Sequence, residues 1–362
     1  MKIETRTVPS KKGDITIYKL INSKGAYVEL SSLGAGIISV VVPDKEGKLT
    51  DVALGYKDPA DYFYDGPCMG KTPGRYAGRI ANGRFTINDK TYSLPINNGP
   101  NHLHGGPEGF QNQIWNTYEC RIKEVWGETF ATVTFSLFSP DGDMGYPGNM
   151  IAKVVYTWYD DNELLIDLIN TCDLPTVANL TNHTYFNLNG EDSGSILNHT
   201  LWLKYRNYLP TDENLIPTGE VASVIGTPMN FSSHKKRIGK DIKKDFPALN
   251  YGKGYDNCWV TTKGMDRPFL DHVACLEADK SGIVLDVRSS QPGVVIYTGN
   301  WLSGSPISKS GRSYNDYDGV AIECQYWPDA PNHPEWEGVG YDHKGKSSNM
   351  AFIEFSFSVK EK

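Results

Sequence analysis

Short runs in which apolar and polar residues alternate are the main pattern along the chain. Residues 131–138 read Ala-Thr-Val-Thr-Phe-Ser-Leu-Phe, so that Val133 and Phe135 fall on one face, and residues 351–357 repeat this alternation. Because successive side chains of a β-strand point to opposite faces, a period of two predicts strands at both places. Residues 164–169 are apolar at all positions but one, which predicts a strand that is covered on both faces.

Turn-forming residues separate these runs. Asn82-Gly83, residues 139–142 (Ser-Pro-Asp-Gly) and residues 146–149 (Tyr-Pro-Gly-Asn) each stand between two candidate strands, and such residues favour the backbone angles of tight turns. No long stretch keeps the 3.6-residue period of a helix, and 36 Gly and 21 Pro leave little room for one. We therefore predict an all-β fold, a large sandwich of antiparallel sheets. A barrel or a propeller is a weaker alternative, the latter because the chain shows no internal repeat.

Length and composition narrow the class of protein. The chain has 362 residues, 39% of them hydrophobic, and a formal net charge of −7, which leaves ample apolar material for a large core. We expect residues 1–362 to form a single domain, since all-β domains often exceed the usual ~100–200 residues. No Lys/Arg-rich block is present, so neither nucleic acid nor an anionic membrane is an expected partner. No run reaches the ~20 apolar residues of a membrane-spanning helix.

Cysteine usage and the first residues bear on the compartment. The six cysteines are scattered and form no Cys-x-x-Cys pair, which favours reduced thiols over a disulfide or zinc framework. Residues 1–14 are polar and lack the apolar stretch of a secretory signal. A cytoplasmic location is the expectation, and nothing in the sequence indicates an oligomeric state.

Two histidines stand in settings that suit chemistry. His104 precedes two glycines in residues 101–106, and His183 lies among hydroxyl and amide side chains in residues 179–188. Histidine titrates near neutral pH and can transfer protons. Spacing alone favours two structural histidines, and it leaves open a metal site to which His102 and His104 contribute.

Two carboxylates are candidates for roles beyond structure. Glu323 lies within residues 320–325, an otherwise mostly apolar run that would bury it. A buried charge is costly unless it is paired or used, so Glu323 is a candidate general base. Asp256 follows Gly254 and Tyr255 in a loop, where an acid beside an aromatic ring can hold ligand hydroxyl groups. A plain turn residue fits the Asp256 pattern better on spacing alone.

A series of short motifs occurs in a fixed order along the chain. They are residues 74–83 (GRYAGRIANG), 101–106 (NHLHGG), 145–148 (GYPG), 180–188 (LTNHTYFNL), 254–256 (GYD), 291–293 (QPG), 297–300 (YTGN), 323–325 (ECQ) and 328–330 (PDA). Each motif is weak by itself. Their combined order, from near Gly34 almost to the C-terminus, resembles the aldose 1-epimerase (galactose mutarotase) family.

The resemblance implies a β-supersandwich with an open sugar site on its concave face. It also implies an enzyme that interconverts the α and β anomers of free aldohexoses such as galactose and glucose. The expected partner is a free monosaccharide, and neither a metal nor a cofactor is expected. The matched catalytic positions are Glu323 (general base), His183 (general acid) and His104 (second histidine), and the matched substrate-binding positions are Arg79, Asp256 and Gln291.

Ring opening by one base and one acid requires particular charge states. The base removes the proton of the C1 hydroxyl while the acid delivers a proton to the ring oxygen. Glu323 would then need a pKa low enough for ionisation, which Arg79 or a histidine could provide, and His183 would need a carboxylate that raises its pKa. Trp301, just after residues 297–300, is a candidate platform for the C–H groups of the sugar.

Three positions depart from the family pattern. Gly78 stands where Asn is common, Val295 where Gln is usual, and Asn257 where His often occurs. These departures leave the acid and base intact and bear on the preferred sugar. The same fold could instead carry a non-catalytic carbohydrate-binding protein, a hexose-6-phosphate 1-epimerase or a metal-dependent sugar isomerase. Retention of His183 with Glu323 argues against a pure binding protein, and the lack of a basic cluster argues against a phosphosugar enzyme.

Overall fold

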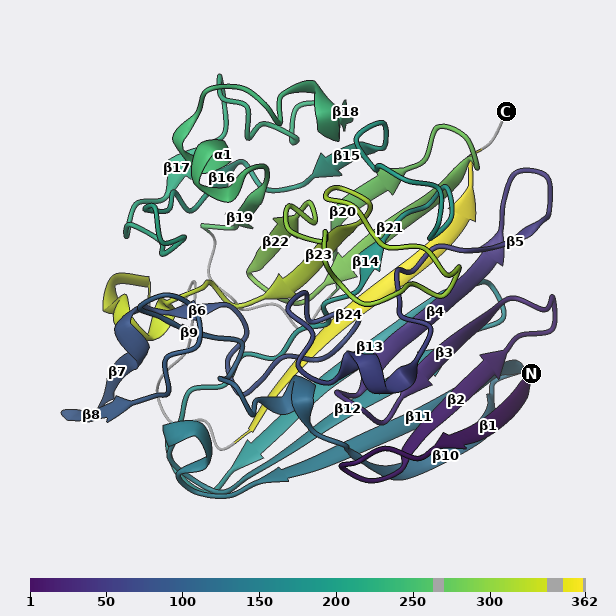
Figure 1. Ribbon diagram of the computed structural model, residues 1–362, viewed down its shortest axis with the longest axis horizontal. Helices are drawn as coiled ribbons and strands as arrows, with labels where there is room; N and C mark the ends of the chain where they lie inside the picture. Colours follow the sequence, from purple (N-terminus) through teal and green to yellow (C-terminus); the bar gives the residue numbers. More distant parts are fainter. Residues whose placement is uncertain (263–269, 337–347, 361–362) are drawn as a thin grey trace.

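β-Strands make up nearly all regular structure of the chain. The computed structural model describes residues 1–262, 270–336 and 348–360 (Figure 1). Within these residues all paired strands run antiparallel, and α1 (Pro247–Gly252) is the single α-helix. The predicted all-β sandwich is confirmed.

Three large sheets carry the described part of the fold. The nine-stranded sheet contains, in spatial order, β10 (Asn116–Val125), β11 (Glu128–Ser139), β12 (Met150–Trp158), β13 (Glu163–Cys172), β24 (Ser348–Val359), β21 (Ile283–Ser289), β20 (Asp271–Glu277), β15 (Thr200–Leu203) and β18 (Lys236–Arg237). The six-stranded sheet contains β14 (Tyr185–Phe186), β23 (Val320–Gln325), β22 (Gly293–Tyr297), β19 (Asp256–Val260), β16 (Asn207–Tyr208) and β17 (Ala222–Ser223). The five-stranded sheet contains β1 (Lys2–Val8), β2 (Ile15–Ile21), β3 (Tyr27–Ser31), β4 (Gly36–Pro43) and β5 (Leu49–Asp51).

Smaller elements complete the described chain. Two-stranded sheets pair β6 (Arg79–Ile80) with β9 (His102–Leu103) and β7 (Arg84–Ile87) with β8 (Lys90–Ser93). Short 3₁₀ turns are η1 (Pro59–Tyr62), η2 (Ala81–Gly83), η3 (Phe110–Asn112), η4 (Asp143–Gly145), η5 (Ile238–Lys240), η6 (Ala330–Asn332) and η7 (Pro334–Trp336).

The predicted strands form with one difference. Residues 131–138 lie in β11 and residues 351–357 in β24, as the alternation predicted. The prediction that residues 164–169 are covered on both faces is wrong. In β13, Ile166 and its face are buried, whereas the opposite face, with Asp167, is only partly covered. Neighbouring strands shield the apolar side chains of that outer face without burying them.

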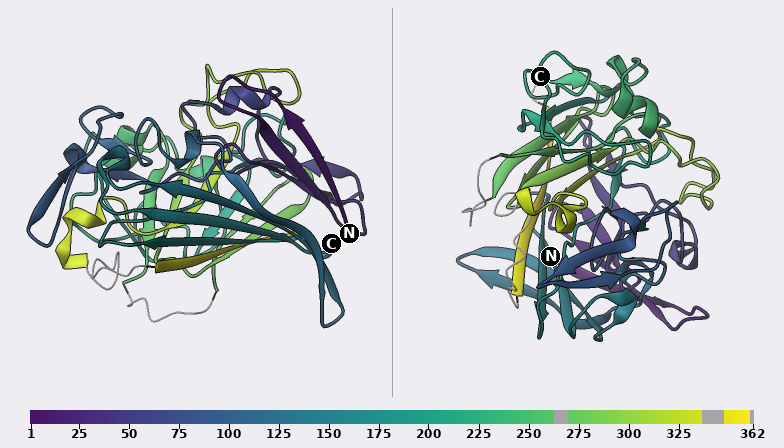
Figure 2. Two further views of the ribbon diagram at one scale, coloured as in Figure 1. Left: turned by 90° about the horizontal axis from the view of Figure 1, so that it is seen from below. Right: turned by 90° about the vertical axis from the view of Figure 1, so that its left-hand side faces the viewer.

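The core lies between the inner face of the nine-stranded sheet and the other two large sheets (Figures 1 and 2). Tyr18 on β2 packs on Phe135 of β11 with ring centroids 5.9 Å apart. Phe186 on β14 packs on Phe355 of β24 at 5.1 Å. Aromatic rings bury large apolar areas, so the first contact holds the five-stranded sheet, and the second the six-stranded sheet, against the nine-stranded sheet.

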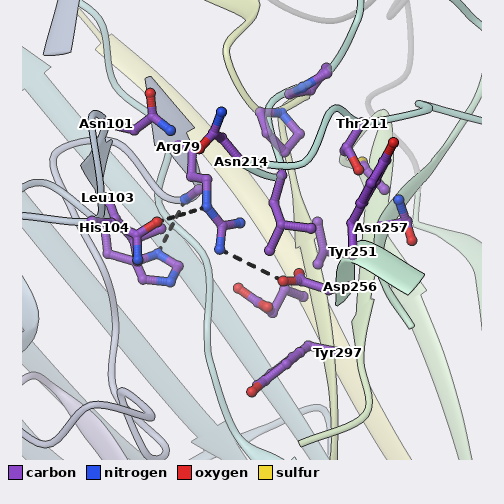
Figure 3. A pocket seen from close by; sticks show the side chains of 18 of the residues that line it. Arg79, Asn101, Leu103, His104, Thr211, Asn214, Tyr251, Asp256, Asn257 and Tyr297 are labelled. Carbon is purple, nitrogen blue, oxygen red and sulfur yellow. Dashed lines mark hydrogen bonds and ion pairs between the residues drawn. The ribbon is translucent and has the colours of Figure 1, made fainter. Parts of the chain in front are cut away.

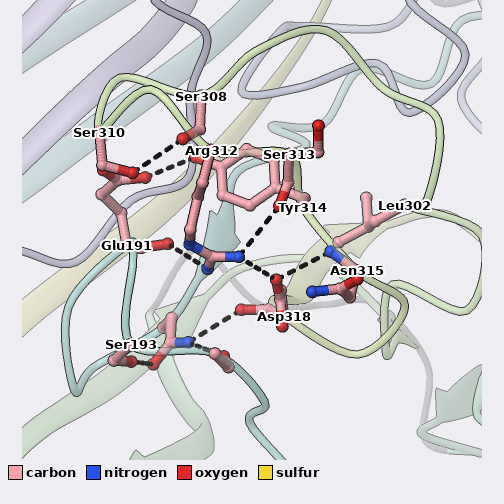
Figure 4. A network of polar contacts seen from close by, with 12 residues as sticks. Glu191, Ser193, Leu302, Ser308, Ser310, Arg312, Ser313, Tyr314, Asn315 and Asp318 are labelled. Atoms are coloured by element: carbon pink, nitrogen blue, oxygen red, sulfur yellow. Dashed lines mark hydrogen bonds and ion pairs between the residues drawn. The ribbon is translucent and has the colours of Figure 1, made fainter.

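The loop between β22 and β23 is held by a polar network (Figure 4). Arg312 Nη1 lies 2.8 Å from Asp318 Oδ2, and the hydroxyl of Tyr314 donates to Glu191 Oε2 over 2.7 Å. Both carboxylates are buried, and each therefore has the partner that a buried charge requires. Trp301 lies near the start of this loop, which runs from residue 298 to residue 319.

Neither a disulfide nor a membrane-spanning helix occurs among the described residues. All six cysteines are unpaired; five are buried and Cys120 is exposed. Among the described residues, no helix has the length and apolar character that crossing a membrane requires.

Candidate active site

A cavity of about 550 Å³ lies against the six-stranded sheet (Figure 3). Its wall includes side chains of β19, β22 and β23, the β6–β9 pair, and loops that contain residues 98–101 and 211–217. Concave sites of this size, with a few convergent polar groups, are typical of small-molecule binding. All predicted site residues except Gln291 are among those that line it.

His183 and Glu323 face each other because of strand register. β14 and β23 pair with Tyr185 opposite Ala321, and the same register extended by two residues sets His183 opposite Glu323. The Nε2 atom of His183 lies 3.3 Å from the Oε1 atom of Glu323. Both residues are buried. The general acid and the general base expected from the sequence are therefore in direct contact on the floor of the cavity.

Burial sets the charge states of this pair in the free protein. It lowers the pKa of His183 to about 4. Burial also raises the pKa of Glu323 well above its ordinary value, with the charge of Asp256 adding to the rise and Arg79 opposing it. Both directions are opposite to those expected from the sequence, because the loss of water outweighs the attraction between the charged forms.

Between these two pKa values the pair holds one proton. A neutral carboxyl beside a neutral imidazole contains as many protons as a carboxylate beside an imidazolium. Transfer across the 3.3 Å contact between Glu323 and His183 therefore converts one form into the other without exchange with solvent. The ion-pair form supplies a base and an acid together.

His104 is held in one tautomer by the backbone of Gly78. The N–H group of His104 donates to the carbonyl of Gly78 over 3.0 Å, and the N–H group of Gly78 donates to His104 Nδ1 over 3.2 Å. An accepting Nδ1 places the proton of the neutral ring on Nε2. Burial, together with the charges of His183 and Arg79, keeps the pKa of His104 well below its ordinary value. His104 is therefore a neutral hydrogen-bond donor.

The turn that presents His104 requires glycine at the next position. Gly105 has φ +80, and a Cβ atom there would lie 1.7 Å from the carbonyl oxygen of Gly74. No side chain can occupy that space, which explains the glycine in the motif.

Arg79 connects two walls of the cavity (Figure 3). Its Nε atom donates to Asn98 Oδ1 over 3.1 Å, and its Nη2 atom lies 3.7 Å from Asp256 Oδ2. Burial raises the pKa of Asp256, and the charge of Arg79 opposes this rise. The pair presents a cation and a carboxylate side by side, an arrangement that can bind neighbouring hydroxyl groups.

Gln291 does not join this group. It is buried in the turn before β22, outside the residues that line the cavity. Its backbone N–H group donates to Ser289 Oγ, and its carbonyl accepts from the hydroxyl of Tyr205. The strand register explains why Gln291 lies outside the cavity wall. Gly293, the first residue of β22, pairs with Gln325, the last residue of β23, so position 291 lies beyond the paired part of the two strands.

Trp301 and the three positions expected to differ from the family pattern lie in the cavity wall. Trp301 is 41% exposed and stacks beside Tyr297, with ring centroids 6.4 Å apart and an interplanar angle of 21°. Gly78, Asn257 and Val295 also line the cavity. All three positions therefore border the space in which a ligand would bind.

Sequence reasoning missed Asn98, Tyr297 and Gln325 as members of the cavity wall. Asn98 lies just before the motif that contains His104, in residues 97–101 (Asn-Asn-Gly-Pro-Asn). Two neighbouring amide side chains before a Gly-Pro turn could have indicated a binding loop. Gln325 follows Glu323 by two residues on one strand, so it had to share the face of the candidate base.

His102 does not act beside His104. Its Nδ1 atom lies 2.7 Å from the carbonyl of Pro95, and its Nε2 atom lies 2.8 Å from the hydroxyl of Tyr146. Over residues 1–262, 270–336 and 348–360, no three or more His, Cys, Asp or Glu side chains are grouped so that they could hold a metal ion.

Comparison with known proteins identifies relatives that match most of the chain. The family model described as aldose 1-epimerase matches residues 16–351. An aldose 1-epimerase from Haemophilus influenzae is 40% identical over 346 residues, 94% of this chain and 96% of the relative. Galactose mutarotase from Homo sapiens is 38% identical over 342 residues, 93% and 94% of the two chains. The crystal structure of galactose 1-epimerase from Lactobacillus acidophilus superimposes with a TM-score of 0.83 at 27% identity, over 100% of both chains.

The fold and the cavity are those of a sugar-epimerase β-sandwich, with a histidine and a glutamate in contact beneath a polar pocket. The chain belongs to the aldose 1-epimerase family, and it is an isomerase.

Proposed function

We propose that the protein interconverts the α and β anomers of free aldohexoses such as galactose and glucose. The observation that carries this proposal is the 3.3 Å contact between Glu323 Oε1 and His183 Nε2 at the base of the cavity. Anomer exchange moves protons at the C1 hydroxyl and at the ring oxygen, and both oxygens are bonded to C1. A base and an acid that serve them must therefore have neighbouring tips.

The reaction begins from the ion-pair form of Glu323 and His183. The carboxylate of Glu323 removes the proton of the C1 hydroxyl, and the electrons of that O–H bond form the carbonyl. The bond between C1 and the ring oxygen breaks, and the ring oxygen takes the proton of the His183 imidazolium. Rotation about C1–C2 presents the other face of the aldehyde. Return of both protons closes the ring as the other anomer and restores the pair.

Three further residues position the sugar in this proposal. His104 donates from Nε2, the ring nitrogen that the contact with Gly78 leaves protonated. Arg79 and Asp256, 3.7 Å apart, bind ring hydroxyl groups. Charged partners give strong and directional hydrogen bonds, and fixed geometry lowers the entropic part of the barrier.

The cavity favours a free sugar over a phosphorylated one. Among the described residues that line it, Arg79 is the one Lys or Arg side chain, whereas Glu213, Asp256 and Glu323 are acidic. A phosphate would meet two or three carboxylates and a single cation that already faces Asp256. Phosphate recognition usually relies on several cations.

Domain organisation and location form part of the proposal. Residues 1–362 act as one catalytic domain in the cytoplasm, and the six unpaired cysteines suit a reducing compartment. Subcellular fractionation of the native protein tests the location.

Polarimetry tests the proposed activity. Freshly dissolved α-D-galactose and α-D-glucose are followed with and without the protein, and again in EDTA. We expect faster relaxation to an unchanged final rotation, with the same rate in EDTA. Relaxation no faster than in buffer would contradict the proposal, and sugar titration would then test for a pure binding protein.

A further inference from the structure

The carboxamide of Gln325 is buried beside the cavity without a partner. Gln325 is 1% exposed and lines the cavity together with Glu323 and His183. Neither its Nε2 nor its Oε1 atom has a hydrogen-bond partner within the described residues. Thr181 is near in the strand register, but its hydroxyl donates to the carbonyl of Cys324 over 2.7 Å. Buried amides are nearly always paired, so these two atoms call for an explanation.

The sheet register places Gln325 on one side of the reacting groups. Cys258, Val295 and Glu323 are direct neighbours across β19, β22 and β23. Two residues further along β22 from Val295 lies Tyr297, which pairs with Asp256 of β19. Gln325 lies two residues from Glu323 in the other direction, on the same face of β23. Gln325 and the Asp256 side of the cavity therefore flank Glu323, each about 7 Å along the strands.

Two glycines border the Gln325 side chain. Gly293 is its partner in β22, and Gly78 crosses above it. A Cβ atom at Gly78 would lie 3.3 Å from Gln325 Nε2. Gly78 also lines the cavity, and the absence of a side chain there leaves the carboxamide uncrowded on its cavity side.

We propose that Gln325 is a specificity-determining residue that accepts a hydrogen bond from one hydroxyl group of the bound sugar and donates one to the neighbouring hydroxyl group. A carboxamide has an acceptor and a donor side by side, which matches a vicinal diol. This inference rests on the proposed function, because it places a sugar ring between Gln325 and the Arg79–Asp256 pair. A site built to hydrogen-bond a hydroxyl group rejects analogues that lack it, since its own polar atoms then stay unpaired.

The test crosses one variant with a panel of sugars. Gln325→Met keeps the length of the side chain and removes both hydrogen-bonding atoms. Its KM is compared with that of the unaltered protein for galactose and for its 2-, 3-, 4- and 6-deoxy analogues. We expect Gln325→Met to raise KM for galactose about 10-fold. For two deoxy analogues of neighbouring positions, this difference should shrink to about 3-fold or less.

A stability measurement separates this role from a structural one. Replacing a buried polar group that has no protein partner by an apolar group of similar size should leave the Tm unchanged or raise it. A marked loss of Tm in Gln325→Met would mean that the carboxamide has a structural partner, and would overturn the proposal. Gln113→Met, in a loop outside the cavity, is the matched amide control and should leave every KM unchanged.

The experiment distinguishes a failure of the Gln325 proposal from a failure of the proposed activity. The Kd of each sugar is measured by calorimetry alongside KM, so that the comparison holds even where turnover fails. A protein that does not accelerate anomer exchange would defeat the proposed function alone. Equal effects of Gln325→Met on all five sugars, or no effect on any, would defeat the Gln325 proposal alone.

Discussion

His183 and Glu323 lie opposite each other in the extended register of β14 and β23, with Nε2 and Oε1 3.3 Å apart. Because both are buried and in contact, the protonation state of each affects the other. The chemistry of the site therefore belongs to the pair, and it depends on how many protons the pair holds.

The activity should follow a broad bell-shaped pH profile. As pH falls through about 4, the pKa of His183, the pair gains a second proton and loses its base. As pH rises through the raised pKa of Glu323, the pair loses its only proton and with it the acid. We expect kcat/KM to decline near pH 4 and again well above the ordinary range of Glu. Polarimetry corrected for the buffer reaction measures the profile, and an acid limb near the ordinary pKa of histidine (about 6.5) would contradict this account.

Replacement of His104 should slow the reaction without shifting its pH limits. Asn tolerates the positive φ of this position, so His104→Asn should fold while losing the donor at Nε2. We expect kcat/KM to fall on the order of 10²-fold, as for other lost electrostatic donors. The Tm serves as the control for folding. A displaced acid limb in this variant would show that His104 titrates, contrary to its expected neutral state.

Arg79 and Asp256 should act as one unit in sugar binding. We expect Arg79→Met and Asp256→Asn each to raise KM about 10-fold, with smaller effects on kcat, since each leaves a partly buried charge or dipole unpaired. Because the two side chains contact each other, the double variant should lose less than the sum of the single losses. Strictly additive losses, measured by initial-rate polarimetry, would show that the two residues bind the sugar independently.

The fold could be predicted from the sequence where the pattern of residues within one strand was sufficient. Alternation in residues 131–138 predicted β11, because burial of one face by a neighbouring sheet needs only a period of two. The prediction for residues 164–169 was wrong because apolar side chains on the outer face of β13 are only shielded by their neighbours. Sequence cannot distinguish that shielding from burial by a further layer.

The site was accessible in part. The order of motifs indicated His183 and Glu323, but their contact depends on the pairing of strands that are distant in sequence. The expected pKa directions were wrong because the sequence shows which charges occur and does not show how much water surrounds them. Gln291 resembled a binding residue by its place in a motif, but it lies in the turn before β22, outside the residues that line the cavity.

One prediction concerns stability rather than catalysis. Burial raises the pKa of Asp167 on the outer face of β13 to about 6, and its Oδ1 atom has no hydrogen-bond partner among the residues that the structure describes. A raised pKa in the folded state means that stability is greatest below the pKa of the unfolded chain and declines as pH rises through about 6. Asp167→Asn should therefore raise stability at pH 8, on the order of 1 kcal/mol because the group is partly exposed, and should change little at pH 4. Thermal unfolding at both pH values measures this, and an equal gain at both would refute the ionisation account.

The most direct test of the central claim is the rate of anomer exchange in Glu323→Gln. The amide keeps the shape of the side chain and cannot accept the C1 proton. Turnover of α-D-galactose by polarimetry and sugar affinity by calorimetry are measured for the variant and the unaltered protein, with the Tm as a control for folding. We predict that kcat falls on the order of 10²–10⁴-fold while Kd stays within about 3-fold. Turnover near that of the unaltered protein would contradict the assignment of Glu323 as the base.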